Sequence, residues 1–243
     1  MLVTARTPKL ADVIPAKVRH NAWCSMRKRP KITKALTEIE HGSELDACEA
    51  AKQLADVNGE DVLAGLFRIL RSAERPCSRE AAAYALSWNK DRKAVTALLM
   101  CASDPDEQDS IRGQAVEGLA MHLDDDSARP RLRRKAADLM IEMLRSPSPT
   151  LRFWACFGLG TLRYRRAIPP LRKLKRTDHD VCPGWWYVRE EAEDAIEWIA
   201  GRPGQDRQPL HLRTQQNTEP DASPNRRPAR QLPARSRRRG GGR

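Results

Sequence analysis

The stretch that decides the fold reads Arg79-Glu-Ala-Ala-Ala-Tyr-Ala-Leu86, and related phrases recur along the chain. The later copies are Arg112-Gly-Gln-Ala-Val-Glu-Gly-Leu119, Arg152-Phe-Trp-Ala-Cys-Phe-Gly-Leu159 and Arg189-Glu-Glu-Ala-Glu-Asp-Ala-Ile196, and a degenerate copy, Ala47-Cys-Glu-Ala-Ala-Lys-Gln-Leu54, precedes them all. Successive copies start 32, 33, 40 and 37 residues apart. A period in this range predicts a stack of helical units, each of which buries its apolar side against its neighbours.

A second helix is predicted between successive phrases, because apolar residues there follow helical spacing. These stretches are Val62–Leu70, Val95–Ala102, Leu132–Met143 and Ile168–Leu174, and a further helix over Lys31–Ile39 precedes the first phrase. Prolines separate the helices and mark loops. No alternating apolar pattern of useful length is present, so the expected fold class is all-α.

The arginine that recurs at the start of four phrases predicts a stacking role within this chain. Each is expected to reach a loop carboxylate of an adjacent unit, as Arg112 to Asp104 and Arg189 to Asp180. A phosphate-binding ladder is the less favoured alternative. Hydroxyl residues just before three of these arginines are expected to cap the phrase helices: Ser78, Ser110 and Thr150.

The junctions between units resemble those of HEAT repeats, in particular the short repeats of the phycobilisome-lyase type. Asp104-Pro-Asp106 leads into Ile111-Arg112, and the hydrophobic–arginine pair returns at Leu151-Arg152 and Val188-Arg189. The resemblance covers residues 31–200. It implies a right-handed α-solenoid of about five HEAT-like helical hairpins, and it leaves function open because the family includes scaffolds, regulators and a few enzymes.

Charge is distributed unevenly along the 243 residues, whose net charge is +12. Residues 1–42 carry +6, residues 43–200 carry −2 and residues 201–243 carry +8. We therefore expect an irregular basic lead-in over residues 1–30, a nearly neutral solenoid over 31–200 and a disordered Arg/Pro-rich tail over 201–243. Basic ends of this kind are typical of segments that touch polyanions.

The six cysteines contain no C-x-x-C pair and are expected to be reduced thiols. No apolar run approaches the roughly 18 residues of a membrane span, and the N-terminus lacks the apolar stretch of a secretory signal. The expected location is therefore cytoplasmic, without a membrane partner.

No catalytic constellation, cofactor motif or metal-ligand set stands out in the sequence. His179 and Cys182 are too few for a zinc site, and the acidic residues of the last phrase are expected to be charge on an exposed helix face. The sequence therefore predicts a protein that is not an enzyme, with no catalytic residues, cofactor or metal.

Two groups of residues are candidates for binding. The helices between phrases are basic, and if these second helices line the concave face, Arg133, Arg134, Arg172, Lys173 and Arg176 make its groove positive. The alternative is ordinary charge on solvated faces. The second group is the aromatic run Trp185, Trp186 and Tyr187, which either anchors a partner or seals the end of the stack with Trp198.

These observations favour a non-catalytic scaffold or adaptor that holds a protein partner in its concave groove. The alternative is a nucleic-acid-binding protein that uses the basic groove and the arginine-rich tail. A third class, an enzyme or accessory protein of the phycobilisome-lyase or HEAT-like DNA glycosylase kind, is disfavoured by the absence of a visible catalytic constellation.

Overall fold

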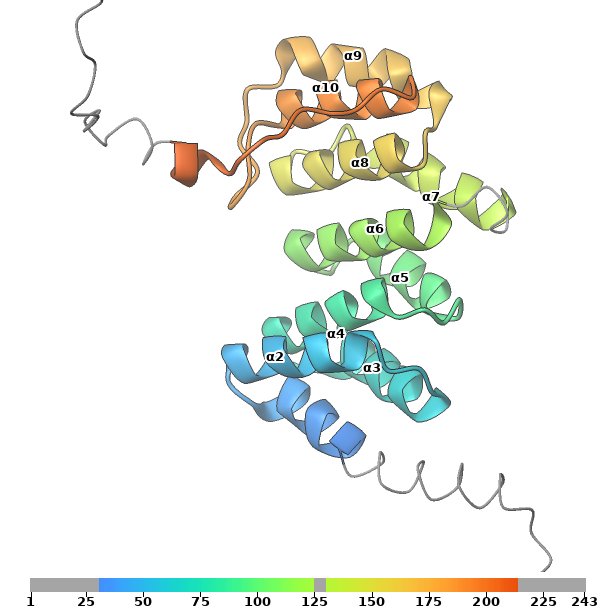
Figure 1. Cartoon of the computed structure of the whole chain (residues 1–243), viewed down its shortest axis with the longest axis vertical. Helices are drawn as coiled ribbons and strands as arrows, with labels where there is room; N and C mark the ends of the chain where they lie inside the picture. Colours follow the sequence, from blue (N-terminus) through green and yellow to red (C-terminus); the bar gives the residue numbers. More distant parts are fainter. Residues whose placement is uncertain (1–30, 125–129, 214–243) are drawn as a thin grey trace, which may run out of the picture.

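The computed structural model describes residues 31–124 and 130–213, which form an elongated stack of helices (Figure 1). A helix over residues 31–41 comes first. The helices that follow are α2 (Glu44–Ala55), α3 (Glu60–Ser72), α4 (Pro76–Trp88), α5 (Ala94–Ser103), α6 (Asp109–Leu123), α7 (Pro130–Met143), α8 (Pro149–Thr161), η2 (Arg165–Ala167), α9 (Ile168–Thr177) and α10 (Val188–Ile199). Within the described ranges there is no strand, only an isolated bridge between Val181 and Tyr187.

The helices form two layers. The phrase layer consists of α2, α4, α6, α8 and α10, each of which packs on the next. The outer layer consists of the 31–41 helix, α3, α5, α7 and α9. Each of α3, α5, α7 and α9 packs chiefly on the phrase helix that follows it, so the structural unit is an outer helix and then a phrase helix. The all-α solenoid predicted from the sequence is confirmed.

Small residues allow the phrase helices to approach closely. Ala82, Ala115, Ala155 and Ala192, which share one position of the phrase, are fully buried. Gly160 brings α8 against the backbone of α10, since a Cβ at this position would lie 2.7 Å from the Cα of Ala195. Interiors packed at this density have little room for added atoms.

The two layers differ in spacing. Phrase helices contact one another along the whole stack. In the outer layer the 31–41 helix contacts α3 through the Arg68–Glu40 ion pair, and α3 contacts α5, whereas the contacts among α5, α7 and α9 are marginal. The basic helices α7 and α9 belong to the outer layer, and that they line a concave groove stays a prediction.

Arginines at the phrase starts join consecutive units. Arg152 donates to Ser146 O (2.8 Å) and Pro147 O (2.9 Å) in the loop before α8, and its Nε donates to Asp178 Oδ2 (2.7 Å) in the loop before α10. Arg79 likewise bonds Ala73 O (2.8 Å) and Glu107 Oε2 (2.8 Å). Charge-assisted bonds of this kind fix the stacking geometry.

The stacking role is present, but the two pairings expected from the sequence are not. Arg112 approaches Asp109 of its own helix (3.6 Å), and Arg189 bonds the imidazole of His179 (2.9 Å). Ser78, Ser110 and Thr150 do not cap their helices, because α4, α6 and α8 begin before these residues. Pro76 and Pro149 occupy the first turns of α4 and α8, where a missing N–H is tolerated.

Replacing Arg152 by methionine should lower the free energy of unfolding by about 3–5 kcal/mol, because the buried Asp178 carboxylate loses its partner. The control is Lys93→Ala, which removes the exposed pair with Glu60 and should leave stability nearly unchanged, because solvent screens this pair. Urea denaturation measures both. Equal losses in the two variants would contradict a stacking role for Arg152.

Replacing Gly160 by alanine should destabilise the protein although alanine favours helices by about 1 kcal/mol. The added methyl meets the α10 backbone, and overpacking of this kind costs about 1–3 kcal/mol. Gly65→Ala is the matched control, because its methyl meets only the flexible end of the Leu36 side chain. Thermal melts should show a lower Tm for the first variant than for the second.

Candidate functional site

The side of α4, α6, α8 and α10 that faces away from the outer layer, here called the phrase face, is acidic and aromatic. Residues spaced three or four apart on each helix point to this side. These positions hold no lysine or arginine. The residues there are Glu80, Tyr84, Trp88, Gln114, Glu117, Met121, Trp154, Phe157, Glu191, Asp194 and Trp198. The basic residues of the repeat body are concentrated instead on the outer layer.

Six aromatic rings gather at the C-terminal end of this face. Trp154 lies edge-on to both Phe157 (5.6 Å between ring centroids) and Trp185 (5.4 Å). Trp186 packs on Trp185 and Phe153, and Trp198 of α10 packs on Phe157 (5.9 Å). The near-perpendicular rings enclose space on several sides instead of forming a single stack.

Glu191 lies at the base of this cluster and is only 1% exposed. Its Oε2 accepts a hydrogen bond from Trp186 Nε1 (3.0 Å), while its buried Oε1 has no partner among the described residues. Burial, and next the charge of Asp194, raise the pKa of Glu191 to about 8. The Trp186 N–H and the charge of Arg207 oppose this rise without cancelling it.

A cavity of about 230 Å³ lies between these rings and carboxylates. It is lined by α6, α8 and α10, the 185–186 turn and residues 205–207. Glu117 reaches it from α6, and burial raises the pKa of this carboxyl above its ordinary value. The sequence-based expectation of a uniformly exposed acidic helix face is therefore wrong for Glu191 and Asp194, which are buried.

Residues 201–213, here called the strap, run back across α10 on the way to the end of the described chain (Figure 1). Arg207 of the strap pairs with Asp194 and Glu193 (2.9 Å to Glu193 Oε2), and its side chain is 8% exposed. The Leu210 N–H donates to Trp185 O (3.1 Å). The expected disordered tail over 201–243 is thus corrected for residues 201–213, and the remainder lies outside the described residues.

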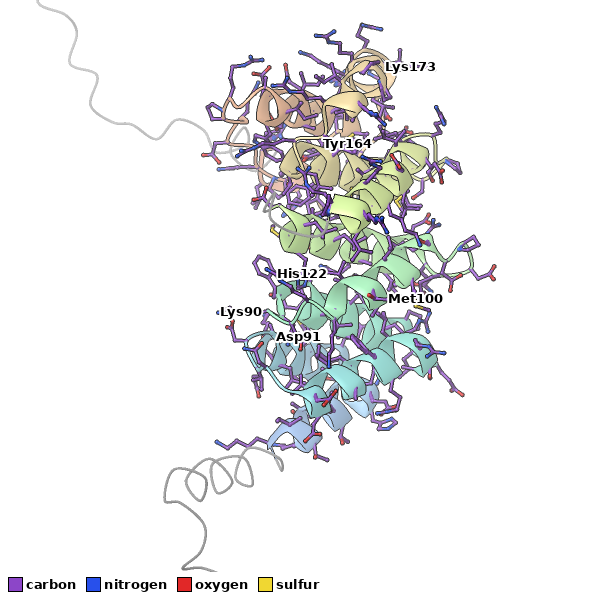
Figure 2. The ribbon with its side chains drawn as sticks, turned by 90° about the vertical axis from the view of Figure 1, so that its right-hand side faces the viewer. Lys90, Asp91, Met100, His122, Tyr164 and Lys173 are labelled. Atoms are coloured by element: carbon purple, nitrogen blue, oxygen red, sulfur yellow. The ribbon has the colours of Figure 1, made fainter. Side chains whose placement is uncertain are left out.

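The basic residues predicted to bind lie on the outer layer. Arg134 is exposed on α7, and Arg172, Lys173 and Arg176 are exposed on α9 (Lys173 is labelled in Figure 2). Arg133 is half-buried and its guanidinium bonds the backbone carbonyls of Leu123 (3.2 Å) and Leu162. Arg133 therefore joins the ends of α6 and α8 and is less available to a ligand.

The predicted aromatic residues lie on the other side. Trp185 and Trp186 complete the cluster around Glu191, and Tyr187 precedes the first turn of α10 with the Arg189 guanidinium over its ring (4.7 Å). The structure therefore does not bring the predicted basic and aromatic residues together. Sequence reasoning did not identify Glu191, Trp154 and Arg207 as site residues. The signal that could have found this face is the lack of lysine and arginine at the outward positions of the phrases, which the sequence shows.

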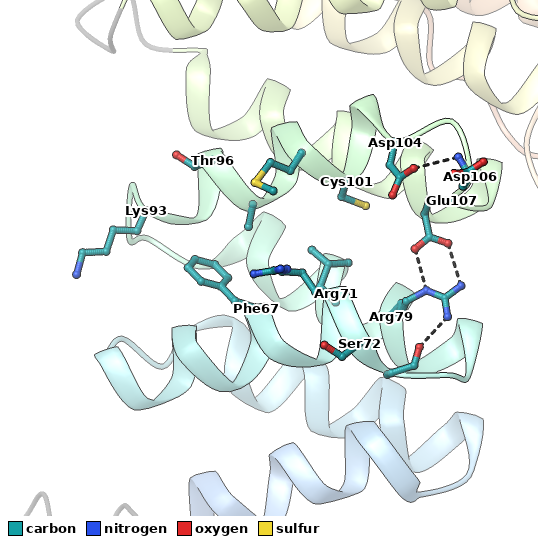
Figure 3. A pocket seen from close by; sticks show the side chains of 14 residues that line it. Phe67, Arg71, Ser72, Arg79, Lys93, Thr96, Cys101, Asp104, Asp106 and Glu107 are labelled. Carbon is teal, nitrogen blue, oxygen red and sulfur yellow. Dashed lines mark hydrogen bonds and ion pairs between the residues drawn. The ribbon is translucent and has the colours of Figure 1, made fainter.

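A second hollow of about 560 Å³ lies where α3 and α5 diverge in the outer layer (Figure 3). Phe67, Ala97 and the 60%-exposed Met100 give it an apolar side. Arg79 and Glu107 line its other side, and they already form an ion pair with each other that joins consecutive units. No group of three or more potential metal ligands is found in the part of the chain that the structure describes.

Comparison with known proteins identifies the repeat. The family described as HEAT repeats matches residues 30–120 and again 105–197. No curated protein sequence matches significantly. Among solved structures, human deoxyhypusine hydroxylase in complex with glycerol is 19% identical over 79% of this chain and 82% of that chain, with a TM-score of 0.35.

This comparison contradicts the prediction that the chain is not an enzyme, because a chain aligned over most of its length is a hydroxylase by its title. The likeness is too low to carry any activity to this chain. Among the described helices, none combines the length and apolar character that a membrane span requires.

Stability should fall as the pH rises from the ordinary carboxyl pKa toward about 8. In that interval folded Glu191 retains a proton that the unfolded chain has lost, so its contribution is complete at lower pH and disappears at higher pH. Glu191→Gln cannot ionise and should flatten the decline in Tm between pH 5 and pH 8.5. The exposed Glu60→Gln is the control and should leave the decline as in wild type.

Proposed function

Because the chain belongs to the HEAT-repeat family, we propose that it is a scaffold or adaptor that binds a protein partner along the phrase face. A repeat stack presents an extended surface whose side chains come from several units in register. Here that surface runs from α4 to α10 and differs in charge from the opposite layer. A partner can therefore bind the phrase face selectively, because its charge differs from that of the outer layer.

The docked strap is the observation that carries this proposal. Residues 201–213 lie on the phrase face, held by the ion pairs of Arg207 and by the backbone bond from Leu210 to Trp185. Arg213 adds a second basic contact, to Glu190 (3.1 Å). The strap is an extended segment whose arginines bind carboxylates beside aromatic rings. We infer that a partner segment binds the phrase face through the same kinds of contact.

The part of the face that the strap leaves uncovered has the same chemistry. Glu80 and Tyr84 of α4 line a hollow of about 420 Å³ together with Gln114 of α6. Trp88 is 45% exposed beside Tyr84, at a ring separation of 6.4 Å. A partner segment with arginine or lysine next to an apolar side chain fits this combination of carboxylate and exposed ring.

The nucleic-acid alternative is favoured by a different observation on the outer layer. Arg134, Arg172, Lys173 and Arg176 are exposed and make no ion pair with the residues that the structure describes. Such cations attract phosphate in a strongly salt-dependent way. For either function we propose a cytoplasmic location, consistent with the five cysteines of the described part being free thiols.

The test uses the intact chain, immobilised and exposed to native lysate with and without nuclease. A double variant, Glu80→Lys with Trp88→Ala, reverses charge and removes the exposed ring on the phrase face. Its matched control, Arg172→Glu with Lys173→Glu, changes charge only on the outer layer. We expect a protein that survives nuclease to be retained by wild type and control but lost from the phrase-face variant.

Circular dichroism should first confirm that both variants retain wild-type helicity. A partner lost only from the outer-layer variant, together with release by nuclease, would support nucleic-acid binding and overturn the scaffold proposal. Equal retention by all three proteins would also contradict the role assigned to the phrase face.

A further inference from the structure

The hollow between α3 and α5 has an apolar side that is open to solvent. Its volume is about 560 Å³, and Phe67, Ala97 and Met100 form its apolar side. Phe67 and Ala97 are half-buried, whereas Met100 is 60% exposed. An exposed, flexible thioether beside a ring is the kind of apolar surface that protein partners use, because it adapts to the shape of the group it meets.

The two ends of this hollow carry opposite charge. Lys93 lies at one end, and Asp104 and Asp106 lie at the other (Figure 3). Arg71 is an exposed second cation of the lining. Among the described residues, Arg71 and the two aspartates make no ion pair, and the pair of Lys93 with Glu60 is largely exposed. These charges are therefore available to a partner of complementary polarity.

The walls of the hollow favour a helical partner segment over an extended one. The hollow lies between α3 and α5, whose backbone groups are bonded within each helix, so the walls offer no strand edge to which a peptide could add. A segment that enters an apolar hollow must then satisfy its own backbone, and a helix does so. Lys93 and Asp104 flank the ten residues of α5, which span about 15 Å, or about three helical turns.

The charged ends fix the direction of such a helix. The first turn of a helix has N–H groups without intrahelical partners and a partial positive charge, and the last turn has carbonyl groups and a partial negative charge. The carboxylates of Asp104 and Asp106 complement the first turn, and the cations of Lys93 and Arg71 complement the last. Because α5 runs from the Lys93 end to the Asp104 end, the docked helix is antiparallel to α5, with opposed dipoles.

We propose that a partner protein docks one amphipathic helix of about three turns in this hollow, antiparallel to α5. Its apolar side chains, spaced i, i+3 or i+4 and i+7, contact Phe67, Ala97 and Met100. The inference goes beyond the proposed function, because the hollow lies in the outer layer and not on the phrase face. A scaffold with both surfaces holds two partners at once, one on each layer.

The first experiment selects peptides of about 15 residues, displayed on phage, on the immobilised full chain. We expect retained peptides whose apolar residues follow the i, i+3 or i+4 and i+7 spacing. Synthesised without the phage, they should gain helicity on binding, as measured by difference circular dichroism. Retention of extended or proline-rich sequences alone, or of none, would overturn the proposal.

A matched pair of methionine variants then locates the site. Met100→Glu places a charge in the apolar side of the hollow and should weaken binding of the helical peptides by about tenfold or more. Met121→Glu makes the same change on the phrase face, where Met121 is 40% exposed, and should leave binding unchanged. Both side chains are exposed, so circular dichroism should show wild-type helicity in both variants. Wild-type affinity in Met100→Glu would reject the hollow as the site.

The direction of the docked helix is measured with a benzophenone at either end of a selected peptide. Mass spectrometry should find the N-terminal label on residues 104–107 and the C-terminal label on residues 93–97. The reverse pattern would contradict the antiparallel arrangement. Sedimentation of the free chain tests the remaining occupant: self-association that Met100→Glu abolishes would place a second copy in the hollow and overturn a separate partner.

Failure of this inference is distinguishable from failure of the proposed phrase-face function. The Glu80→Lys, Trp88→Ala double variant should bind the helical peptides as wild type does. Met100→Glu should still retain the lysate partner that the phrase face binds. Loss of both ligands from either variant would contradict two separate surfaces.

Discussion

Close contact between successive phrase helices is the constraint on which the structure depends. Alanine and glycine at the repeated positions let α4, α6, α8 and α10 pack backbone to backbone, and the loop-directed arginines hold consecutive units in register. The outer helices carry larger side chains and lie further apart.

The site depends on the same packing. Tight spacing of α6, α8 and α10 brings outward residues of three units within reach of one another, so that Glu117, Trp154 and Glu191 share one cavity although they are far apart in sequence. The loop before α10 then folds over α8 and supplies Trp185 and Trp186. Burial by these rings gives Glu191 its altered acidity. The polar site is thus a consequence of close apolar packing.

The repeat phrase and the apolar spacing between phrases were enough to predict the all-α stack, because both are local patterns. The stacking role of the phrase arginines was predicted, but the carboxylates that they pair with were not. Arg152 pairs with Asp178 and Arg79 with Glu107, because each guanidinium extends to the next loop along the stack. Burial of Glu191 was not predictable from helix periodicity. Its cover comes from the 185–186 turn and the strap, two segments without a repeating pattern, and the strap was itself assigned to a disordered tail.

The strap also bears on how the stack comes apart. In a repeat array each unit is held by its neighbours, and terminal units, with a neighbour on one side only, fray first. Arg207, Arg213 and the Leu210 amide clamp the last unit to its own following segment. The α9–α10 hairpin and the strap are therefore expected to separate from the rest of the stack together, as one cooperative block.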